Sequence, residues 1–183
     1  PIVPNRDQSD DDRDGAGDPC DANGFCYVVD RVDACLDPAD PFQVYAGAAR
    51  IIRTGEELPL HFWSNRRNRA IEYEWSVVSR PEASRATINH PRGSATLSTP
   101  YQYHYKMGRT VDFRPDQPGE YVLKINTRLI FDDDLFPGKL LASNQLSLTA
   151  DGEPVGSGCS TTRVGGWHAL LALLGLFLLR RKS

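Results

Sequence analysis

The sequence predicts a mainly β protein whose central body, residues 42–150, is an antiparallel β-sandwich. Three observations lead to this prediction. Apolar and polar residues alternate with a period of two in several segments of the body. Glycine and proline turn signals separate these segments, and none of them has the period of a helix. Many short strands joined by turns are typical of a sandwich.

The N-terminal segment has the composition of a calcium-binding loop. Aspartates at alternate positions are followed by glycines in Asp10-Asp11-Asp12-Arg13-Asp14-Gly15-Ala16-Gly17-Asp18. Calcium takes hard oxygen ligands, and a glycine allows the sharp turn that brings later ligands back to the ion. The candidate ligands are the carboxylates of Asp10, Asp12, Asp14 and Asp18 and the backbone carbonyl of Ala16. The alternative is a solvated acidic linker, because runs of like charge are often solvated.

Residues 1–21 as a whole resemble a thrombospondin type 3 repeat. The resemblance rests on Pro1-Ile2-Val3-Pro4-Asn5-Arg6-Asp7-Gln8, on the aspartates that follow, and on Cys20-Asp21. It implies a chain wrapped around Ca²⁺ with little hydrophobic core, and it makes Asn5 and Asp21 peripheral ligand candidates. The family pattern also has a cysteine directly before the position of Pro1. We therefore expect earlier repeats, with one further half-cystine, upstream of this chain.

Three cysteines lie close together around a segment predicted to be a linker, residues 22–41. They are Cys20, Cys26 and Cys35. The C-terminal tail described below predicts export, and disulfides are the default for such cysteines in an oxidising compartment. The repeat resemblance implies a bridge from Cys20 to a neighbour such as Cys26, whereas the competing pairing joins Cys26 to Cys35. The sequence does not choose between the two.

Two segments of the body are predicted to be long strands, residues 70–78 and 120–129. Their apolar faces consist of Ile71, Tyr73, Trp75 and Val77 in the first, and of Tyr121, Leu123, Ile125 and Leu129 in the second. Shorter strands are predicted at residues 58–62, 96–98, 111–113 and 146–148. Aromatic residues on a strand face mostly pack in a core, so Trp75 and Tyr121 are predicted core residues.

Two charged stretches of the body are predicted to be exposed. Asn65-Arg66-Arg67-Asn68-Arg69 lies between strand-like segments, so a loop is favoured over a nucleic-acid patch and no nucleic acid is expected as a partner. Asp132-Asp133-Asp134 is interpreted as the solvated end of a hairpin. The tyrosines of Tyr101-Gln102-Tyr103-His104-Tyr105 are interpreted as strand packing rather than a ligand-binding patch.

Two motifs of the body resemble a PKD-type immunoglobulin-like domain. They are Tyr73-Glu74-Trp75-Ser76-Val77-Val78 and Val111-Asp112-Phe113-Arg114-Pro115-Asp116-Gln117-Pro118-Gly119-Glu120-Tyr121. The resemblance implies that Trp75 packs the core and that the Pro-Gly-x-Tyr run turns into the last long strand. The glycine and aspartate motif that usually follows the tryptophan is absent, and residues 89–107 match poorly. A fibronectin-like or other sandwich is the alternative.

The C-terminal tail combines a lone cysteine, a short apolar run and a basic end. After a flexible linker, residues 151–158, Cys159 precedes a predicted hydrophobic helix at residues 164–179, and Arg180-Arg181-Lys182 follows it. The most apolar part would span about 20 Å as a helix, against about 30 Å for a bilayer core. A run this short suits a processing signal, and the basic end would leave the rest outside the cytoplasm.

Residues 159–183, introduced by Gly158, resemble the MYXO-CTERM sorting signal of myxobacterial surface proteins. The resemblance implies that a membrane protease cuts beside Cys159, and that Cys159 is lipidated and anchors the protein at the outer surface. The alternatives are a marginal transmembrane helix and a buried helix with Cys159 in a disulfide.

These features together predict an exported, calcium-binding structural or adhesion protein of the cell surface, without enzymatic activity. The sequence contains no nucleophile elbow, metalloprotease motif or phosphate loop. The expected partners are Ca²⁺, the membrane, a sorting protease, and an unknown surface protein or polysaccharide. The alternative is an accessory fragment of a secreted surface enzyme whose catalytic domain lies upstream of Pro1.

Overall fold

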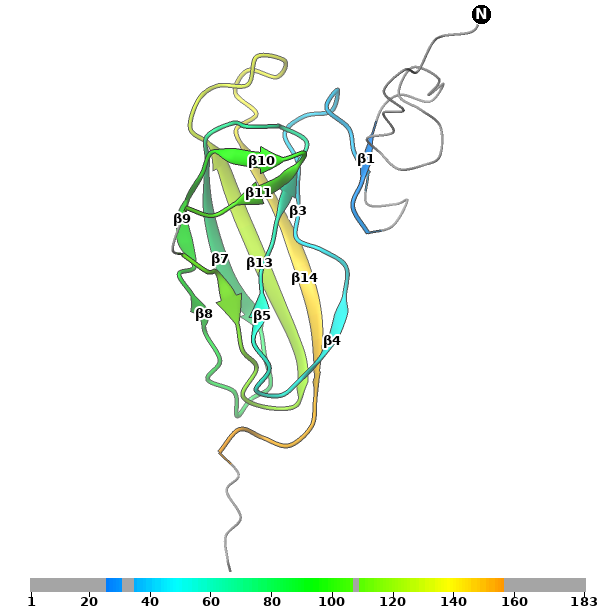
Figure 1. Cartoon of the computed structure of the whole chain (residues 1–183), viewed down its shortest axis with the longest axis vertical. Helices are drawn as coiled ribbons and strands as arrows, with labels where there is room; N and C mark the ends of the chain where they lie inside the picture. The colour runs from blue at the N-terminus through cyan, green and yellow to red at the C-terminus, as the bar shows by residue number, and fades with distance from the viewer. Residues whose placement is uncertain (1–25, 31–34, 107–108, 157–183) are drawn as a thin grey trace, which may run out of the picture.

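The computed structural model describes residues 26–30, 35–106 and 109–156, and within these ranges every regular element is a strand. The larger layer is a five-stranded sheet (Figure 1). Its strands, in spatial order, are β4 (Arg50–Arg53), β14 (Leu141–Asp151), β13 (Gly119–Leu129), β7 (Ile71–Ser79) and β9 (Arg92–Ala95). Neighbours are antiparallel except β4 and β14, which run parallel. The prediction of a β-sandwich built of antiparallel strands is confirmed, and β4 with β14 is the one parallel pair in the described residues.

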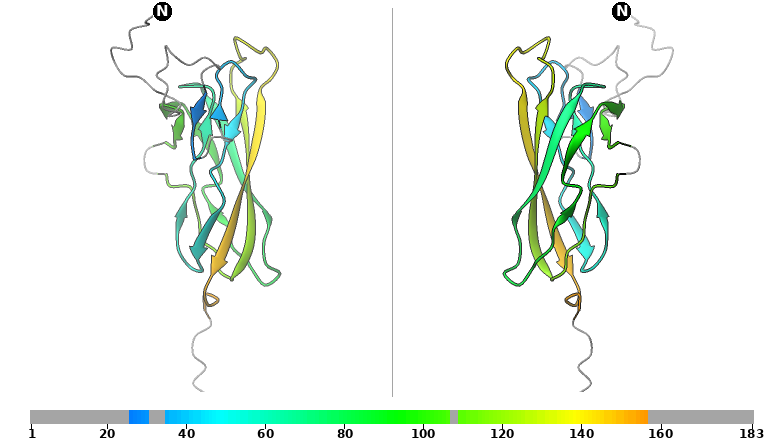
Figure 2. Two further views of the ribbon diagram at one scale, coloured as in Figure 1. Left: turned by 90° about the vertical axis from the view of Figure 1, so that its right-hand side faces the viewer. Right: turned by 90° about the vertical axis from the view of Figure 1, so that its left-hand side faces the viewer.

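The second layer consists of two short sheets that pack against the first (Figure 2). One has the order β10 (Leu97–Thr99), β11 (Gln102–His104), β6 (Trp63–Ser64), β3 (Val44–Tyr45). The other has the order β5 (Leu58–Pro59), β12 (Asp112–Phe113), β8 (Ile88–Asn89). Backbone hydrogen bonds of 2.9 Å extend these pairings, from Leu60 to Val111 next to β5 and β12 and from Tyr103 to Phe62 next to β11 and β6.

The core lies between the two layers and is built by the alternation that the sequence shows. The residues predicted to face inward on β7 and β13 are buried, except that Val77 is only half-buried. Trp75 is 2% exposed and Tyr121 is fully buried, which confirms both as core residues. Burial of a large apolar side chain contributes about 1.5 to 3 kcal/mol, so these two strands supply much of the stabilisation.

Several strands, among them β3, β4, β8 and β9, lie where the sequence predicts none, and β14 is longer than predicted. In β9, Gly93 pairs with Tyr73 of β7. A Cβ at Gly93 would stand 2.6 Å from the Tyr73 hydroxyl, so the missing side chain allows the tyrosine to reach the sheet edge. β14 starts five residues earlier than predicted, at Leu141. Its first half has no buried apolar residue and therefore no strand signal in the sequence. The strand conformation of this half comes from its pairing with β13.

The turn before β13 is held by the hydroxyl group of Tyr121. This group donates to the carbonyl of Gln117 at 2.8 Å and accepts from the N–H of Gln117 at 3.1 Å. Such a tyrosine, bonded to the backbone a few residues upstream, is a recurrent feature of immunoglobulin-like sandwiches. The contact explains why the Pro-Gly-x-Tyr run turns directly into the longest strand.

Candidate functional site: the junction at the N-terminal pole

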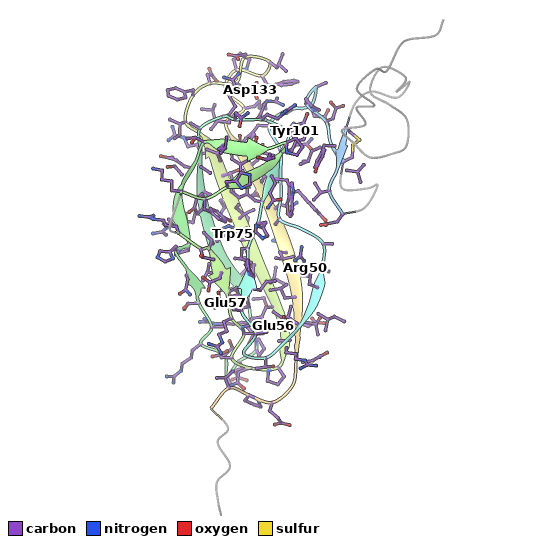
Figure 3. The ribbon with its side chains drawn as sticks, viewed as in Figure 1. Arg50, Glu56, Glu57, Trp75, Tyr101 and Asp133 are labelled. Carbon is purple, nitrogen blue, oxygen red and sulfur yellow. A yellow bond between two sulfur atoms is a disulfide. The ribbon has the colours of Figure 1, made fainter. Side chains whose placement is uncertain are left out.

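The sandwich is elongated along its strands, and the described chain enters and leaves it at opposite ends (Figures 1 and 2). We call one end the N-terminal pole and define it by residues 37–42, 65–69 and 130–140. The other end is the C-terminal pole, defined by residues 53–57 and 151–156. Asp133 lies at the first pole, and Glu56 and Glu57 lie toward the second (Figure 3).

Most of the predicted site residues lie outside the described residues. This applies to the calcium ligands Asp10, Asp12, Asp14, Ala16 and Asp18, to Cys20 and Cys159, and to the predicted helix at residues 164–179. The described ranges contain no helix long and apolar enough to cross a membrane. Within the same ranges, no three His, Cys, Asp or Glu side chains are grouped so that they could hold a metal ion.

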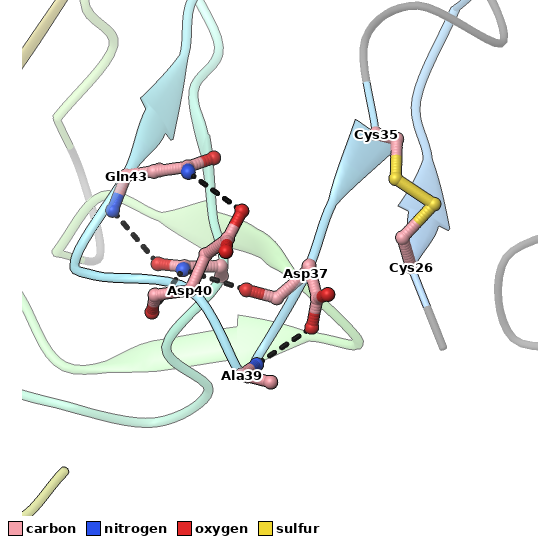
Figure 4. Close-up of a disulfide and its surroundings, with 7 residues drawn as sticks. Cys26, Cys35, Asp37, Ala39, Asp40 and Gln43 are labelled. Atoms are coloured by element: carbon pink, nitrogen blue, oxygen red, sulfur yellow. Dashed lines mark hydrogen bonds between the residues drawn. A yellow bond between two sulfur atoms is a disulfide. The ribbon is translucent and has the colours of Figure 1, made fainter. Parts of the chain in front are cut away.

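Of the predicted disulfide candidates, Cys26 and Cys35 are described, and they are bonded to each other (Figure 4). Their Cα atoms are 5.4 Å apart, and the bond joins β1 (Tyr27–Val28) to β2 (Cys35–Leu36), which pair antiparallel. The structure therefore decides between the two pairings that the sequence left open. Tyr27 and Leu36 are buried with Tyr101 in a small second cluster, so this strand pair packs onto the sandwich.

Asn65 holds the segment that follows β2, residues 37–41. Its side-chain amide donates to the carbonyls of Asp37 at 2.8 Å, Asp40 at 3.2 Å and Pro41 at 2.9 Å. Its side-chain oxygen accepts from the N–H of Gln43 at 2.8 Å. Within the segment, Asp37 accepts from the N–H of Ala39, and Asp40 accepts from the Gln43 side chain (Figure 4). Asn65 is only 2% exposed, and all of its hydrogen-bonding atoms have partners.

Arg66 joins the same segment to the β13–β14 loop, residues 130–140. Its Nη1 and Nη2 donate to the carbonyls of Pro38 and Asp40, at 2.9 and 2.7 Å. Its Nε donates to the Asp133 carboxylate at 2.6 Å, and both side chains of this ion pair are buried. The guanidinium also lies 5.9 Å from the centroid of the Phe136 ring. We call Asn65, Arg66, Asp133 and residues 37–41 together the junction.

The predictions of an exposed arginine loop and a solvated aspartate tip are therefore wrong for Asn65, Arg66 and Asp133. The charges are buried because each one has a partner, which offsets the cost of removing it from water. One signal in the sequence could have revealed the pairing. The arginines directly precede β7 and the aspartates directly follow β13, and antiparallel pairing of Ile71 with Leu129 brings these two ends together.

Electrostatics keep Asp133 ionised. Burial alone would raise the pKa of its carboxyl group. Hydrogen bonds from the N–H of Leu135 and from Arg66, together with the charge of Arg66, outweigh burial and hold the pKa below its usual value. A second ion pair, Arg69 with Asp134, lies nearby but is largely exposed, so it contributes little.

Tyr103 supports the junction from β11. Its hydroxyl group donates to the carbonyl of Arg66 at 2.6 Å and accepts from the N–H of Arg69 at 2.9 Å. Burial raises the pKa of Tyr103 to about 12, although the hydrogen bond and charge of Arg69 partly oppose this. Tyr101 and Tyr103 are both buried, which confirms the prediction that these tyrosines pack within the sandwich.

The β13–β14 loop exposes apolar side chains above this fixed base. Phe131 is 69% exposed and Leu135 is 63% exposed. Exposed apolar groups on a loop whose base is held by buried contacts can present a contact surface to another macromolecule. The N-terminal pole can therefore hold the preceding chain to the sandwich and present apolar side chains to another macromolecule.

Comparison with known proteins gives no functional assignment. No known protein family matches the chain, and no curated protein matches it. Among solved structures, WR4, a C. elegans MSP family member, aligns with 12% identity and a TM-score of 0.38, covering 60% of this chain and 97% of WR4. The YadV chaperone aligns with 11% identity and a TM-score of 0.39, covering 65% of this chain and 55% of YadV. Likeness at this level carries no argument about function.

Proposed function

We propose that this chain is a calcium-binding structural or adhesion protein anchored at a cell surface, in which the sandwich is a rigid spacer. The observation that carries the proposal is the position of the two ends. The chain enters at one pole, where the junction locks it, and leaves at the other as the end of β14 (Figure 1). A domain whose chain enters and leaves at opposite poles lengthens a stalk in the direction of its own long axis.

In this proposal each region has a mechanical task. Ca²⁺ bound to residues 10–18 would neutralise the repulsion among the carboxylates of Asp10, Asp12, Asp14 and Asp18. The disulfide and the junction would pass this stiffness to the sandwich, because Arg66 and Asn65 tie residues 37–41 to the body through five hydrogen bonds to backbone carbonyls. Lipid attached to Cys159 would anchor the C-terminal pole in the membrane after residues 160–183 have been removed.

The test of surface anchoring is the intact mass of the protein recovered from its native membrane. We expect a product that ends at Cys159 and carries added lipid mass. The matched control is Cys159→Ser, which should keep residues 160–183 and carry no lipid. An unmodified wild-type tail would contradict the proposal.

A further inference from the structure

We propose that the outer face of the five-stranded sheet, at its β9 edge, is a binding site for an acidic polysaccharide. The inference names a ligand class for the adhesive role that is proposed above, and to that extent it rests on the proposed function. Its test uses neither calcium nor the C-terminal tail, so either proposal can fail alone.

The site is a cavity of about 550 Å³ whose walls come from β7, β9, β13 and residues 106 and 109. Two rows of paired residues cross its floor. Glu72 stands between Ser94 and Arg128, and Glu74 stands between Arg92 and Asn126. Residues paired across a sheet point to the same face, so both rows face outward. The volume lies within the range of known ligand sites, which is about 300 to 1,000 Å³.

Positive charge exceeds negative charge in this cavity. Four cationic side chains line it, Arg92, Lys106, Arg109 and Arg128, together with the two carboxylates Glu72 and Glu74. Arg92 is paired with Glu74, and Arg128 approaches Glu72 at 3.7 Å. Lys106 and Arg109 are exposed, and neither forms an ion pair with any residue in the described ranges. These two cations are free to bind an anion.

Tyr73 gives an independent indication of a ligand. Its side chain points to the inner face of the sheet and is 4% exposed, and its hydroxyl group reaches the cavity at the β9 edge, where it makes no hydrogen bond to any residue that the structure describes. The hydroxyl ends beside Gly93, at 2.6 Å from the position of a missing Cβ. A hydroxyl group without a protein partner at the wall of a cavity is free to exchange hydrogen bonds with a ligand. Because Gly93 has no side chain, it does not cover this hydroxyl group.

The mixture of groups favours an acidic polysaccharide over other polyanions. Its carboxylates can accept from Lys106 and Arg109, while its hydroxyl groups can donate to Glu72 and Glu74 and exchange hydrogen bonds with Tyr73. An acidic peptide brings carboxylates but few hydroxyl donors, so it leaves the free acceptor positions of Glu72 and Glu74 without partners. A phosphodiester chain meets the same two carboxylates. Only a ligand with both kinds of group satisfies the whole lining.

The experiment measures binding of the full chain to polygalacturonate by titration calorimetry at low salt. The variant Lys106→Gln, Arg109→Gln removes the two free cations. We expect binding to weaken at least about tenfold, because hydrogen bonds to charged groups are among the stronger ones. The charge-matched control is Arg53→Gln, Arg85→Gln, in which two exposed cations away from the cavity are removed, and its affinity should stay within about twofold of the parent.

Tyr73→Phe separates binding from folding. The hydroxyl has no partner in the described residues, so its loss should leave the free energy of unfolding unchanged or higher while it weakens polygalacturonate binding. Equal loss of affinity in the cavity variant and in the control would overturn the proposal. Binding of neutral dextran as tight as that of polygalacturonate would also overturn it. Tighter binding of poly-glutamate would identify an acidic peptide as the ligand instead and refute a polysaccharide site.

Discussion

At the scale of single residues, the junction depends on burial with full pairing. Arg66 and Asp133 are 7% and 5% exposed. The guanidinium of Arg66 donates to the Asp133 carboxylate and to the carbonyls of Pro38 and Asp40. A buried ion pair adds little to stability compared with an apolar pair of the same shape, but removing one partner leaves a buried charge without compensation. The junction is therefore expected to be specific and intolerant of single substitutions.

The first prediction compares two neighbouring aspartates. Asp133→Ala should lower the free energy of unfolding by about 3 kcal/mol, because it leaves Arg66 buried without its carboxylate. Asp134→Ala removes only the exposed pair with Arg69 and should cost less than about 1 kcal/mol. Urea denaturation of the two variants measures the difference. Equal costs would show that the Arg66 pair is not a buried contact in solution.

The Asp133 pair also predicts an acid dependence of stability. The pKa of Asp133 is lower in the folded protein than the usual value of 3.8. Its contribution is therefore fully present above the unfolded pKa and is lost as the pH falls from 3.8 through the lower folded value. The free energy of unfolding of the wild type should fall more steeply over this window than that of Asp133→Ala. Parallel curves would contradict the assignment.

Tyr103 predicts the opposite, alkaline dependence. Its folded pKa of about 12 exceeds the unfolded value of 10.0. The stability that it contributes is therefore present below pH 10 and is lost as the pH rises toward 12. Tyr103→Phe should cost about 1 to 3 kcal/mol at neutral pH, because the carbonyl of Arg66 and the N–H of Arg69 lose their partner. The variant should also lose part of the alkaline slope, and an unchanged slope would contradict the prediction.

At the scale of elements, β1 and β2 depend on covalent closure and on docking. Each strand has two residues, and an isolated two-stranded pair is marginal in water. The pair is held by the Cys26–Cys35 bond and by the cluster that Tyr27 and Leu36 form with Tyr101. The long strands β7 and β14 each pair with β13 over most of their length and need no such closure.

The disulfide can be tested by removing it. In Cys26→Ser, Cys35→Ser, amides of β1 and β2 should exchange with solvent much faster while those of β13 keep their protection. A closed loop of this length contributes about 2 to 3 kcal/mol, so docking of the strand pair should weaken by a similar amount. Cys159→Ser is the control and should change neither. Peptide mapping without reduction should recover Cys26 joined to Cys35, and a Cys20–Cys26 peptide would contradict the structure.

At the scale of the whole molecule, the elongated sandwich transmits orientation from one pole to the other. The value of such a spacer in a stalk depends on the stiffness of the segments that flank it. Residues 1–21 supply this stiffness only if they bind Ca²⁺, since their aspartates repel one another without a cation. Calcium binding is therefore the property of the full chain that most directly affects the proposed function.

Calorimetric titration of the full chain with Ca²⁺ should show binding that Asp12→Ala, Asp14→Ala abolishes. The matched control removes two exposed carboxylates near the C-terminal pole, Glu57→Ala, Glu153→Ala, and should bind as the parent does. Small-angle scattering should show a longer and stiffer particle with Ca²⁺ than with a chelator. Absence of heat in the parent would end the calcium hypothesis.

The sequence by itself determined the sandwich and its core, because side-chain alternation along a strand is a local property. The inward faces of residues 71–77 and 121–129 could be predicted without any knowledge of neighbours, and so could the core positions of Trp75 and Tyr121. The calcium repeat and the sorting tail remain predictions from sequence.

Only the tertiary structure decided what depends on contacts between distant segments. The burial of Arg66 required Asp133, 67 positions away, and this contact exists because β7 and β13 are antiparallel neighbours. The strand position of Gly93 required β7 as its pairing partner, and the pairing of Cys26 required the strand that contains Cys35. Charged and glycine-rich segments look like exposed loops when read alone, because burial of polar groups becomes favourable only when their partners arrive from elsewhere in the fold.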